Sequence, residues 1–518
     1  MKKKYLNRII LGFIAPILVV FSFFYLEKSG IFGPEKRVAV GEEINSEAPF
    51  PSAKSYGYYL MPYTRFGEYG SGAYPDYSAE DVFNFWLDKH DLIINSYLTG
   101  DYKAAAPEKT IIGGTSATEA CCYDYAANEY FWDDQLTILH DWITENWQTY
   151  PWSSQFSSAD VAFEDCFLHL SSDVESMTFS FTTTEDLTIT GYNPVDPTRS
   201  RIPGDWSNDL FLANVKSPVY ISFWQDYYAV YMIERWGSPT IDGYFLDVHE
   251  WTLPQYFSTE EDFEKIIEFT SREEYLQKLS ELTIIIRDTL HQNYPGSILA
   301  VNTYNTIIPG DPPKYAFEDE VDFCVREGSI IYNLALEKVE QEISIAYRLG
   351  NAGKLVAMQH DTRDFYDLNR GKIAGLAVYY MAMTDNVYFY TYVPPGPAYD
   401  PYSSWFEAIA YDIGEPAGEY YVFAQGLDPS NLTGTYKVLA RNFTKGLVLV
   451  KPRPNWSVTN YLSQSQTTHN LGGTYRSLNV DGTLGDPITS ITLRNWEGAI
   501  LLENDTAAPE SIDDLTAS

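Results

Sequence analysis

The sequence predicts a mixed α/β protein: a (β/α)8 TIM barrel, then an all-β sandwich domain, with an N-terminal membrane anchor or signal segment ahead of both. Three observations predict it. From residue 55 to 411, apolar strand-like runs alternate with longer helical patterns. From 412 to 504, short β-rich runs are separated by turn residues. At the N-terminus, a basic flank precedes an uncharged apolar stretch.

Residues 1–35 form the predicted targeting segment. Four basic residues within the first eight positions precede Ile9 to Leu26, which carries no charge across 18 residues. This length is near the lower limit for a spanning helix and no clear cleavage site follows, which favours an uncleaved signal anchor; a cleaved signal peptide is the alternative. In both cases the basic flank stays in the cytoplasm and the rest, after a polar linker at 36–54, is exported.

Eight runs between residues 55 and 411 have the length and composition of buried parallel strands. Eight such strands with helices between them predict closure into a barrel. The expected strands are Tyr56–Tyr63, Asp91–Tyr97, Asp165–Leu170, Gly243–Val248, Ser297–Asn302, Val321–Glu327, Lys354–His360 and Asn386–Val393.

The helical patterns between these runs include one with Ser217 as N-cap and Pro218 at its first position. The region at about 100–160 exceeds a normal βα segment, which predicts an insertion over the barrel mouth that forms a substrate wall or lid. A disulfide from Cys121 or Cys122 to Cys166 is one option for its cysteines, and buried thiols are the other. The expected helices are Ala79–Lys89, Ser217–Trp236, Thr259–Gln292, Ile330–Leu349 and Arg370–Met383.

The C-terminal β-rich region has turn residues between short runs, which predicts a β-sandwich over 412–504. Residues 505–518 are polar and broken by proline; they predict a tail or linker and are similar to the lead-in of fibronectin type III modules. The expected strands are Tyr420–Ala424, Thr435–Arg441, Gly446–Val450, Ile488–Leu493 and Ala499–Glu503.

Charge excludes two classes of partner. Asp and Glu number 71 against 35 Lys and Arg, and the net charge of -36 repels nucleic acids and anionic membranes. We therefore expect no nucleic-acid partner, and membrane contact through the N-terminal segment only. The sequence has no GxSxG elbow, HExxH pair, P-loop or dinucleotide GxGxxG, and it has seven histidines; no metal or cofactor is expected.

Two carboxylates end predicted strands where a barrel builds its active site, at the C-terminal ends. In IDGYFLDVHEW, the alternation of a strand places Gly243, Phe245 and Asp247 on one face; in VDFCVREGS it places Val325 and Glu327 likewise. Two inward carboxylates at a barrel mouth are what glycoside hydrolysis needs for a nucleophile or base and an acid. The alternative is that both are ordinary charges at loop tops.

Two charged residues near these carboxylates, Arg326 and Asp242, fall on the opposite face of their strands. Arg326 is therefore expected to point into the helical layer, where it neutralises Glu327 less than adjacency suggests. Asp242 lies at the bottom of its strand and is expected to cap or pair structurally.

Further polar and aromatic residues follow other strand ends, a rim suited to polyol recognition and to stacking on sugar rings. The candidate substrate-binding residues are Tyr63, Arg65, His249, Trp251, Asn302, Gln359, Asp361 and Tyr392.

With DGYFLD at the fourth strand, AVN at the fifth and RE at the sixth, the stretch from Tyr56 to Tyr411 resembles (β/α)8 glycoside hydrolase families that include relatives of endo-α-1,4-polygalactosaminidase. The segment from DIGEP to ITLRNWEGAILL is similar to the β-domain that follows such barrels. The resemblance implies Asp247 as the leading catalytic carboxylate and Glu327 as its partner. We expect an extracytoplasmic, anchored glycoside hydrolase with a carbohydrate substrate; the rival is a non-catalytic glycan-binding surface protein on a degenerate barrel.

Overall fold

The chain has 518 residues, and a computed structural model describes most of the expected barrel and β-domain. The N-terminal segment, the C-terminal tail and the candidates Tyr63, Arg65, His249 and Trp251 lie outside the described residues. Within the described residues, no helix has the length and apolar character to cross a membrane. The described residues are 56–59, 79–95, 99–116, 119–121, 135–180, 185–203, 210–228, 241–247, 260–302, 320–331, 335–361, 368–392, 405–429, 431–454 and 465–503.

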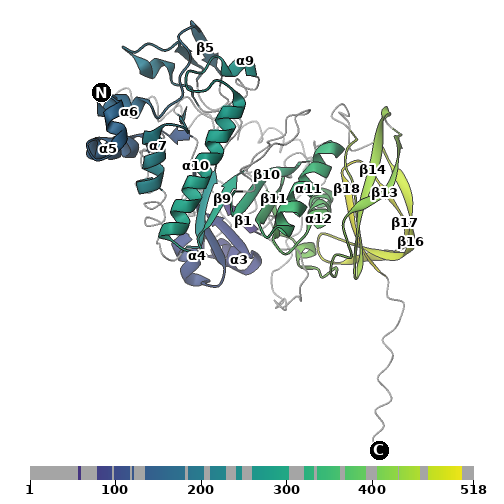
Figure 1. The fold of residues 1–518 in the computed structure, drawn as a ribbon. Helices are drawn as coiled ribbons and strands as arrows, with labels where there is room; N and C mark the ends of the chain where they lie inside the picture. Colours follow the sequence, from purple (N-terminus) through teal and green to yellow (C-terminus); the bar gives the residue numbers. More distant parts are fainter. Residues whose placement is uncertain are drawn as a thin grey trace, which may run out of the picture.

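The core is one sheet of eight parallel strands that follow each other in chain order, β1-β2-β3-β8-β9-β10-β11-β12. The sheet is curled, and its first and last strands approach each other (Figure 1). This is the strand order that the barrel prediction requires. The strands are β1 Tyr56–Tyr59, β2 Leu92–Asn95, β3 Thr110–Ser116, β8 Gly243–Asp247, β9 Ile298–Asn302, β10 Phe323–Ile331, β11 Leu355–Asp361 and β12 Val387–Tyr392.

The third strand is Thr110–Ser116, so the prediction of Asp165–Leu170 was wrong. β3 pairs with β2 and β8, and its Ile111 and Ile112 are fully buried. Its two consecutive glycines weaken the apolar run TIIGGT as a strand pattern. The segment Asp165–Leu170 is apolar because it lies in the core of the insertion. The insertion therefore follows β3 and extends to β8; the expected bounds of 100–160 were wrong.

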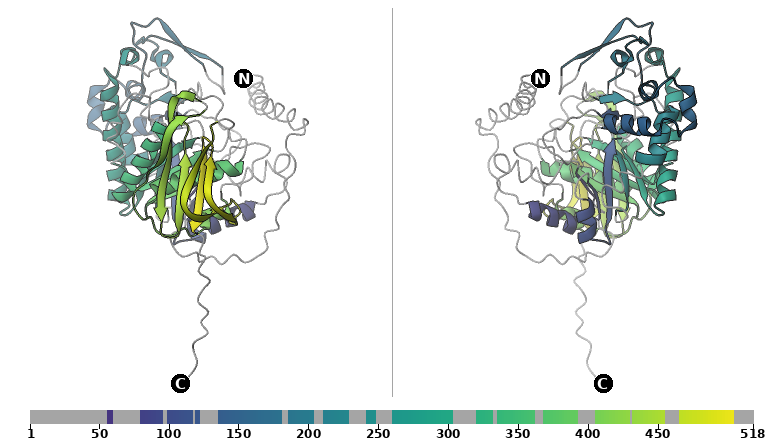
Figure 2. Two further views of the ribbon diagram at one scale, coloured as in Figure 1. Left: turned by 90° about the vertical axis from the view of Figure 1, so that its right-hand side faces the viewer. Right: turned by 90° about the vertical axis from the view of Figure 1, so that its left-hand side faces the viewer.

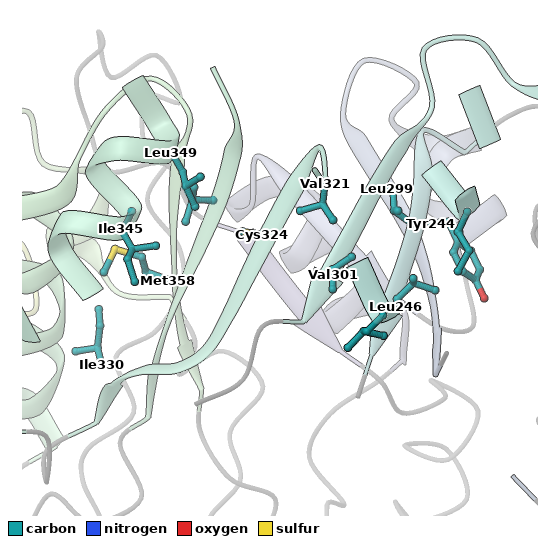
Figure 3. Packing of buried hydrophobic residues seen from close by; sticks show 14 of the residues in the cluster. Tyr244, Leu246, Leu299, Val301, Val321, Cys324, Ile330, Ile345, Leu349 and Met358 are labelled. Atoms are coloured by element: carbon teal, nitrogen blue, oxygen red, sulfur yellow. The ribbon is translucent and has the colours of Figure 1, made fainter. Parts of the chain in front are cut away.

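The two faces of the sheet bury separate sets of side chains. Alternate residues such as Phe245, Ala300 and Val325 form an interior cluster. The residues between them, such as Leu246 and Val301, face the helices and belong to the largest core cluster, as Figure 3 shows. This alternation is the one that the sequence predicted for the fourth and sixth strands.

Helices cover the outside of the sheet close to the predicted places, but the helix predicted from Ile330 begins at Leu336, because Ile330 and Ile331 belong to β10. Ser217 caps α7 by accepting a hydrogen bond from the Tyr220 amide, and Pro218 follows it, as predicted. α7 ends at Phe223 and a π-helical turn, Trp224–Tyr228, follows it; the rest of the predicted helix lies outside the described residues. The long helix predicted at 259–292 is two helices. The helices around the sheet are α3 Ala79–Lys89, α4 Thr99–Ala105, α10 Arg272–Asn293, α11 Leu336–Asn351 and α12 Leu368–Ala382; α9 Glu260–Phe263 lies at the end of the molecule where the insertion is found (Figure 1).

The insertion lies beside the N-terminal end of α10 (Figure 1). In a parallel α/β sheet this is the side to which the strands point, because the chain leaves each strand to begin the next helix. Its buried residues, Trp142, Phe167 and Phe223 among them, belong to the same core cluster as the helix-facing side of the sheet. Its elements are β4 Glu119–Cys121, α5 Gln135–Asn146, η1 Pro151–Gln155, α6 Ala159–Glu164, β5 Ser176–Phe179, β6 Leu187–Thr190, η2 Pro197–Ser200, β7 Leu210–Leu212 and α7 Pro218–Phe223.

A buried charged cluster ties the insertion to the segment before α10. His169, 3% exposed, contacts Glu164 through Nε2 at 3.0 Å and Glu268 through Nδ1 at 2.7 Å. Arg201 donates from Nε to the same Glu164 at 2.7 Å. Both ring nitrogens face carboxylates, so both must carry protons for both contacts to be hydrogen bonds. The cluster therefore contains two cations and two anions.

Cys166 lies next to this cluster as a buried free thiol whose Sγ donates to the Ala162 carbonyl at 3.5 Å. The option of a disulfide from Cys121 or Cys122 to Cys166 was therefore wrong. Burial raises the pKa of the Cys166 thiol well above its ordinary value. It is thus an inert packing residue.

The C-terminal region is a single six-stranded antiparallel sheet, where a two-sheet sandwich was expected. Its central strand β15 is buried on both faces: one face packs on α12, and the outer strands curl around the other (Figures 1 and 2). The expected strands were found; Thr467–Leu478 was missed because its pattern is mostly polar. The strands are β13 Tyr421–Asp428, β14 Asn431–Phe443, β15 Gly446–Lys451, β16 Thr467–Leu478, β17 Leu484–Leu493 and β18 Glu497–Glu503, with η7 Glu407–Ala410 before them.

We expect the charged cluster to make the stability of the insertion depend on pH. Burial by itself would lower the pKa of His169, but hydrogen bonds to Glu164 and Glu268 and their charges outweigh it and raise that pKa above 6.5. A histidine whose pKa is higher in the folded than in the unfolded protein stabilises the fold, and this stabilisation is complete at pH values below the unfolded-state pKa. This stabilisation is lost as pH rises through the folded value, and it amounts to about 1.4 kcal/mol for each tenfold difference in proton affinity between the folded and unfolded states.

Thermal and urea unfolding of the purified protein at several pH values from 6 upward measures this. Replacement of His169→Gln should remove the His169 contribution to the pH slope, and Glu268→Gln should reduce it because one of the two carboxylates remains. Equal slopes in the wild type and in His169→Gln would contradict the assignment.

Candidate functional site

The C-terminal ends of the eight parallel strands meet at one edge of the sheet, and the candidate residues are placed there. In the register of the sheet, Asp247 pairs with Ser116, Asn302 with Val325, and Asp361 with Tyr392. The register therefore makes the candidates Asp361 and Tyr392 neighbours, and it places Asp247 and Asn302 at the last residues of β8 and β9. The side chains of Asp247, Glu327 and Tyr392 are outside its description.

Asp247 is the last residue of β8. Two positions earlier, Phe245 is fully buried in the interior cluster, and Leu246 between them faces the helices. Continued alternation predicts the interior face for Asp247. At the other end of the strand, Gly243 allows β8 to lie close to β9: a Cβ there would be 2.2 Å from the Ile298 carbonyl oxygen.

The prediction that Glu327 ends its strand was wrong: β10 continues to Ile331, and Glu327 lies at an irregularity within it. Arg326 pairs with Met358 and Ile330 with His360, so four residue steps on β10 match two on β11. This is a β-bulge of two extra residues, and it begins at Glu327. Pairing of β10 with β9 ends just before it, at Val325. Bulges are found next to active sites because they change the direction of a side chain; this one was not foreseen from the sequence.

Arg326 points into the helical layer, as predicted. It is 2% exposed, and its guanidinium donates to Glu342 of α11 through Nε at 2.9 Å and through Nη2 at 2.6 Å. The charge of Arg326 is thus neutralised by a carboxylate on the opposite side of the strand from the interior. Glu342 was not recognised from the sequence; its position in the middle of a helix gave no signal.

Three candidate binding residues are buried at the strand ends. Asn302, Gln359 and Asp361 are 2%, 3% and 4% exposed. Gln359 and Asp361 share the parity of Ala357, an interior residue. Amide and carboxylate groups can donate and accept hydrogen bonds, and burying such groups is costly unless they are hydrogen-bonded.

His360 lies between these two residues but faces the helices. It packs against α12, where a Cβ on Gly375 would be 2.0 Å from its ring, and burial lowers its pKa to about 4. A neutral, helix-facing imidazole at this position is part of the packing, so it is not a candidate acid or base.

Asp242 has a structural role, as predicted. Its carboxylate accepts hydrogen bonds from Lys103 Nζ at 2.7 and 2.9 Å and from the Ile111 amide at 2.8 Å. These contacts join α4, β3 and β8 at the N-terminal end of the sheet. The DGYFLD motif therefore carries one acid at each end of β8, and its first acid has its partners in the scaffold.

Among the side chains that the structure describes, no group of three or more His, Cys, Asp or Glu residues is arranged to hold a metal ion.

No protein-family model and no curated protein matches the chain. Several solved structures are similar to it in overall trace. A "Family GH13_31 enzyme" is 10% identical, with 87% of this chain and 99% of the other covered and a TM-score of 0.44. Amy13B of Eubacterium rectale is 9% identical, with 88% and 96% covered and a TM-score of 0.41. Endo-glycoceramidase II from Rhodococcus sp., as its lactosyl-enzyme intermediate, is 9% identical, with 88% and 95% covered and a TM-score of 0.32.

Proposed function

We propose that this protein is a glycoside hydrolase on a (β/α)8 barrel, with Asp247 as nucleophile or base and Glu327 as general acid. One observation carries the proposal: Asp247, the last residue of β8, and Glu327, at the bulge of β10, each lie two positions beyond an interior residue of a curled parallel sheet. Cleavage of a glycosidic bond needs two carboxyl groups, one to attack or to activate water and one to protonate the leaving oxygen.

The surroundings of these positions suit acid–base chemistry. Below them, the interior of the sheet is filled by apolar side chains, including Phe245, Phe323 and Val325. A general acid that stays protonated near neutral pH needs a raised pKa, and apolar surroundings favour one. The guanidinium next to Glu327 in the sequence is held by Glu342 on the helix side and does not counteract this.

Asn302, Gln359 and Asp361 are the proposed contacts to sugar hydroxyl groups. They lie on β9 and β11, which flank β10, so they surround the position of Glu327 on both sides. The insertion adds a wall beside this edge. We also propose that the N-terminal segment anchors the enzyme to the membrane with the barrel outside the cytoplasm, where polysaccharide substrates are found.

Replacement of Asp247→Asn should reduce turnover of a cleaved glycan at least about a thousandfold, because shape is kept and the reacting charge is lost. The substrate is first identified by digesting a polysaccharide panel with the wild type. Asp242→Asn is the matched control: it removes a carboxylate from the same motif and should lower the melting temperature while leaving kcat/KM near the wild-type value. Wild-type turnover by Asp247→Asn would overturn the assignment; specific glycan binding without hydrolysis by the wild type would favour the binding-protein alternative.

Replacement of Glu327→Gln should slow hydrolysis of glycosides with poor leaving groups by about 10²- to 10⁴-fold and largely spare activated aryl glycosides, which need little protonation. Steady-state kinetics on a matched pair of substrates measures the difference. The same loss on both substrates would argue against the acid role.

The anchor proposal predicts that protease added to intact cells releases or degrades the large C-terminal portion, because the basic flank keeps only the N-terminus inside. Immunoblotting against a C-terminal epitope measures this loss, with a cytoplasmic protein as control. Full protection of that portion in intact cells, with digestion after lysis, would contradict export.

A further inference from the structure

We propose that Arg326 and Glu342 are positioning residues for the general acid. Their ion pair fixes the start of the β10 bulge and thereby the direction in which Glu327 leaves the strand. The inference rests on the proposed function and adds to it the two residues, remote from the substrate, that make the acid effective.

The bulge places Glu327 where the regular ladder does not hold the chain. Up to Val325 the strand is paired with β9, and up to Arg326 with β11; in-register pairing with β11 resumes only at Ile330. A catalytic side chain loses efficiency when its geometry varies by a fraction of an ångström. A general acid at the first position of a bulge therefore needs another constraint.

The two hydrogen bonds between the Arg326 guanidinium and the Glu342 carboxylate supply this constraint. Two parallel hydrogen bonds, at 2.9 and 2.6 Å, fix the plane of the guanidinium and not only its distance from the carboxylate. Glu342 is 6% exposed and lies on α11 among buried residues such as Val339 and Ile343, so the acceptor itself is held firmly. The last residue of β10 that pairs before the bulge is thus attached to a rigid helix.

The other end of the bulge is fixed as well. Ser329, 5% exposed, donates from Oγ to the Gln359 carbonyl at 3.5 Å. Ile330 follows with 0% exposure and lies near Met358 and Ile345 in the helix-facing core, as Figure 3 shows. Only Glu327 and Gly328 remain between the two fixed ends.

The Arg326–Glu342 pair also bears on the protonation of the general acid. An unneutralised guanidinium one residue away would favour the ionised carboxylate and lower the pKa of an acid that must stay protonated. Glu342 cancels that charge. Lys338, one turn earlier on α11, adds little cationic charge at alkaline pH, because burial lowers its pKa to about 8.

The test compares hydrolysis of an activated aryl glycoside with that of a poor-leaving-group substrate of the same sugar. Arg326→Lys keeps the positive charge but loses the two parallel hydrogen bonds to Glu342. It should lose about tenfold more kcat/KM on the poor substrate than on the activated one, the same signature as Glu327→Gln at smaller size. Arg441→Lys is the matched control: Arg441 is also buried, at 3% exposure, and donates to the carbonyls of Tyr380 and Met383. It should lower the melting temperature without changing the ratio.

A second variant separates positioning from folding if Arg326→Lys is unstable. The double replacement Arg326→Met with Glu342→Leu substitutes apolar residues for the buried pair, a change that folded proteins often tolerate. It should show the same leaving-group signature at near wild-type melting temperature. If both variants keep the wild-type ratio while Glu327→Gln changes it, the positioning role is wrong and the proposed function stands. If the wild type hydrolyses no glycoside, both are wrong.

Discussion

A parallel strand that is covered on both faces has no side that reaches water, so each polar residue on it must find a partner inside the protein or contact a ligand. This constraint accounts for most of the features of β8 to β12. The interior face of these strands is filled by apolar side chains, and the other face meets the helices. Charged groups in the middle of a strand, such as Arg326, are paired. Further buried polar groups, such as Asn302 and Asp361, are the last residues of their strands, β9 and β11.

The two acids of the DGYFLD motif show how position along one strand divides roles. Asp242, before the strand, accepts three hydrogen bonds from the scaffold and joins α4, β3 and β8. Asp247 ends the strand at the edge where the loops begin. The first is fixed by the need to satisfy backbone and lysine donors, and the second stands at the edge where chemistry is proposed. Neither role follows from the residue type alone.

The insertion contains a buried carboxylate that is balanced by buried cations. In a protein with a net charge of -36, a cluster of carboxylates would repel strongly if buried without cations. Here Glu164 and Glu268 are balanced by His169 and Arg201. Burial would raise the pKa of Glu164, but hydrogen bonds from Arg201 and His169 lower it to about 2, so it stays ionised. The cluster ties the insertion to the segment before α10 and so connects it to the barrel.

The sequence by itself determined the α/β class, the strand order apart from the third strand, the parity of Phe245 and Val325, and the outward direction of Arg326. These depend on local alternation and on length, which neighbouring residues encode. It did not reveal that TIIGGT is the third strand. Two glycines weaken its apolar pattern, and its burial depends on the strands that flank it in the sheet. Only the tertiary structure decided where Arg326 finds Glu342, how His169 joins two distant glutamates, and that β10 bulges at Glu327. Each of these depends on which segments, remote in the chain, are packed together, and no local pattern carries that information.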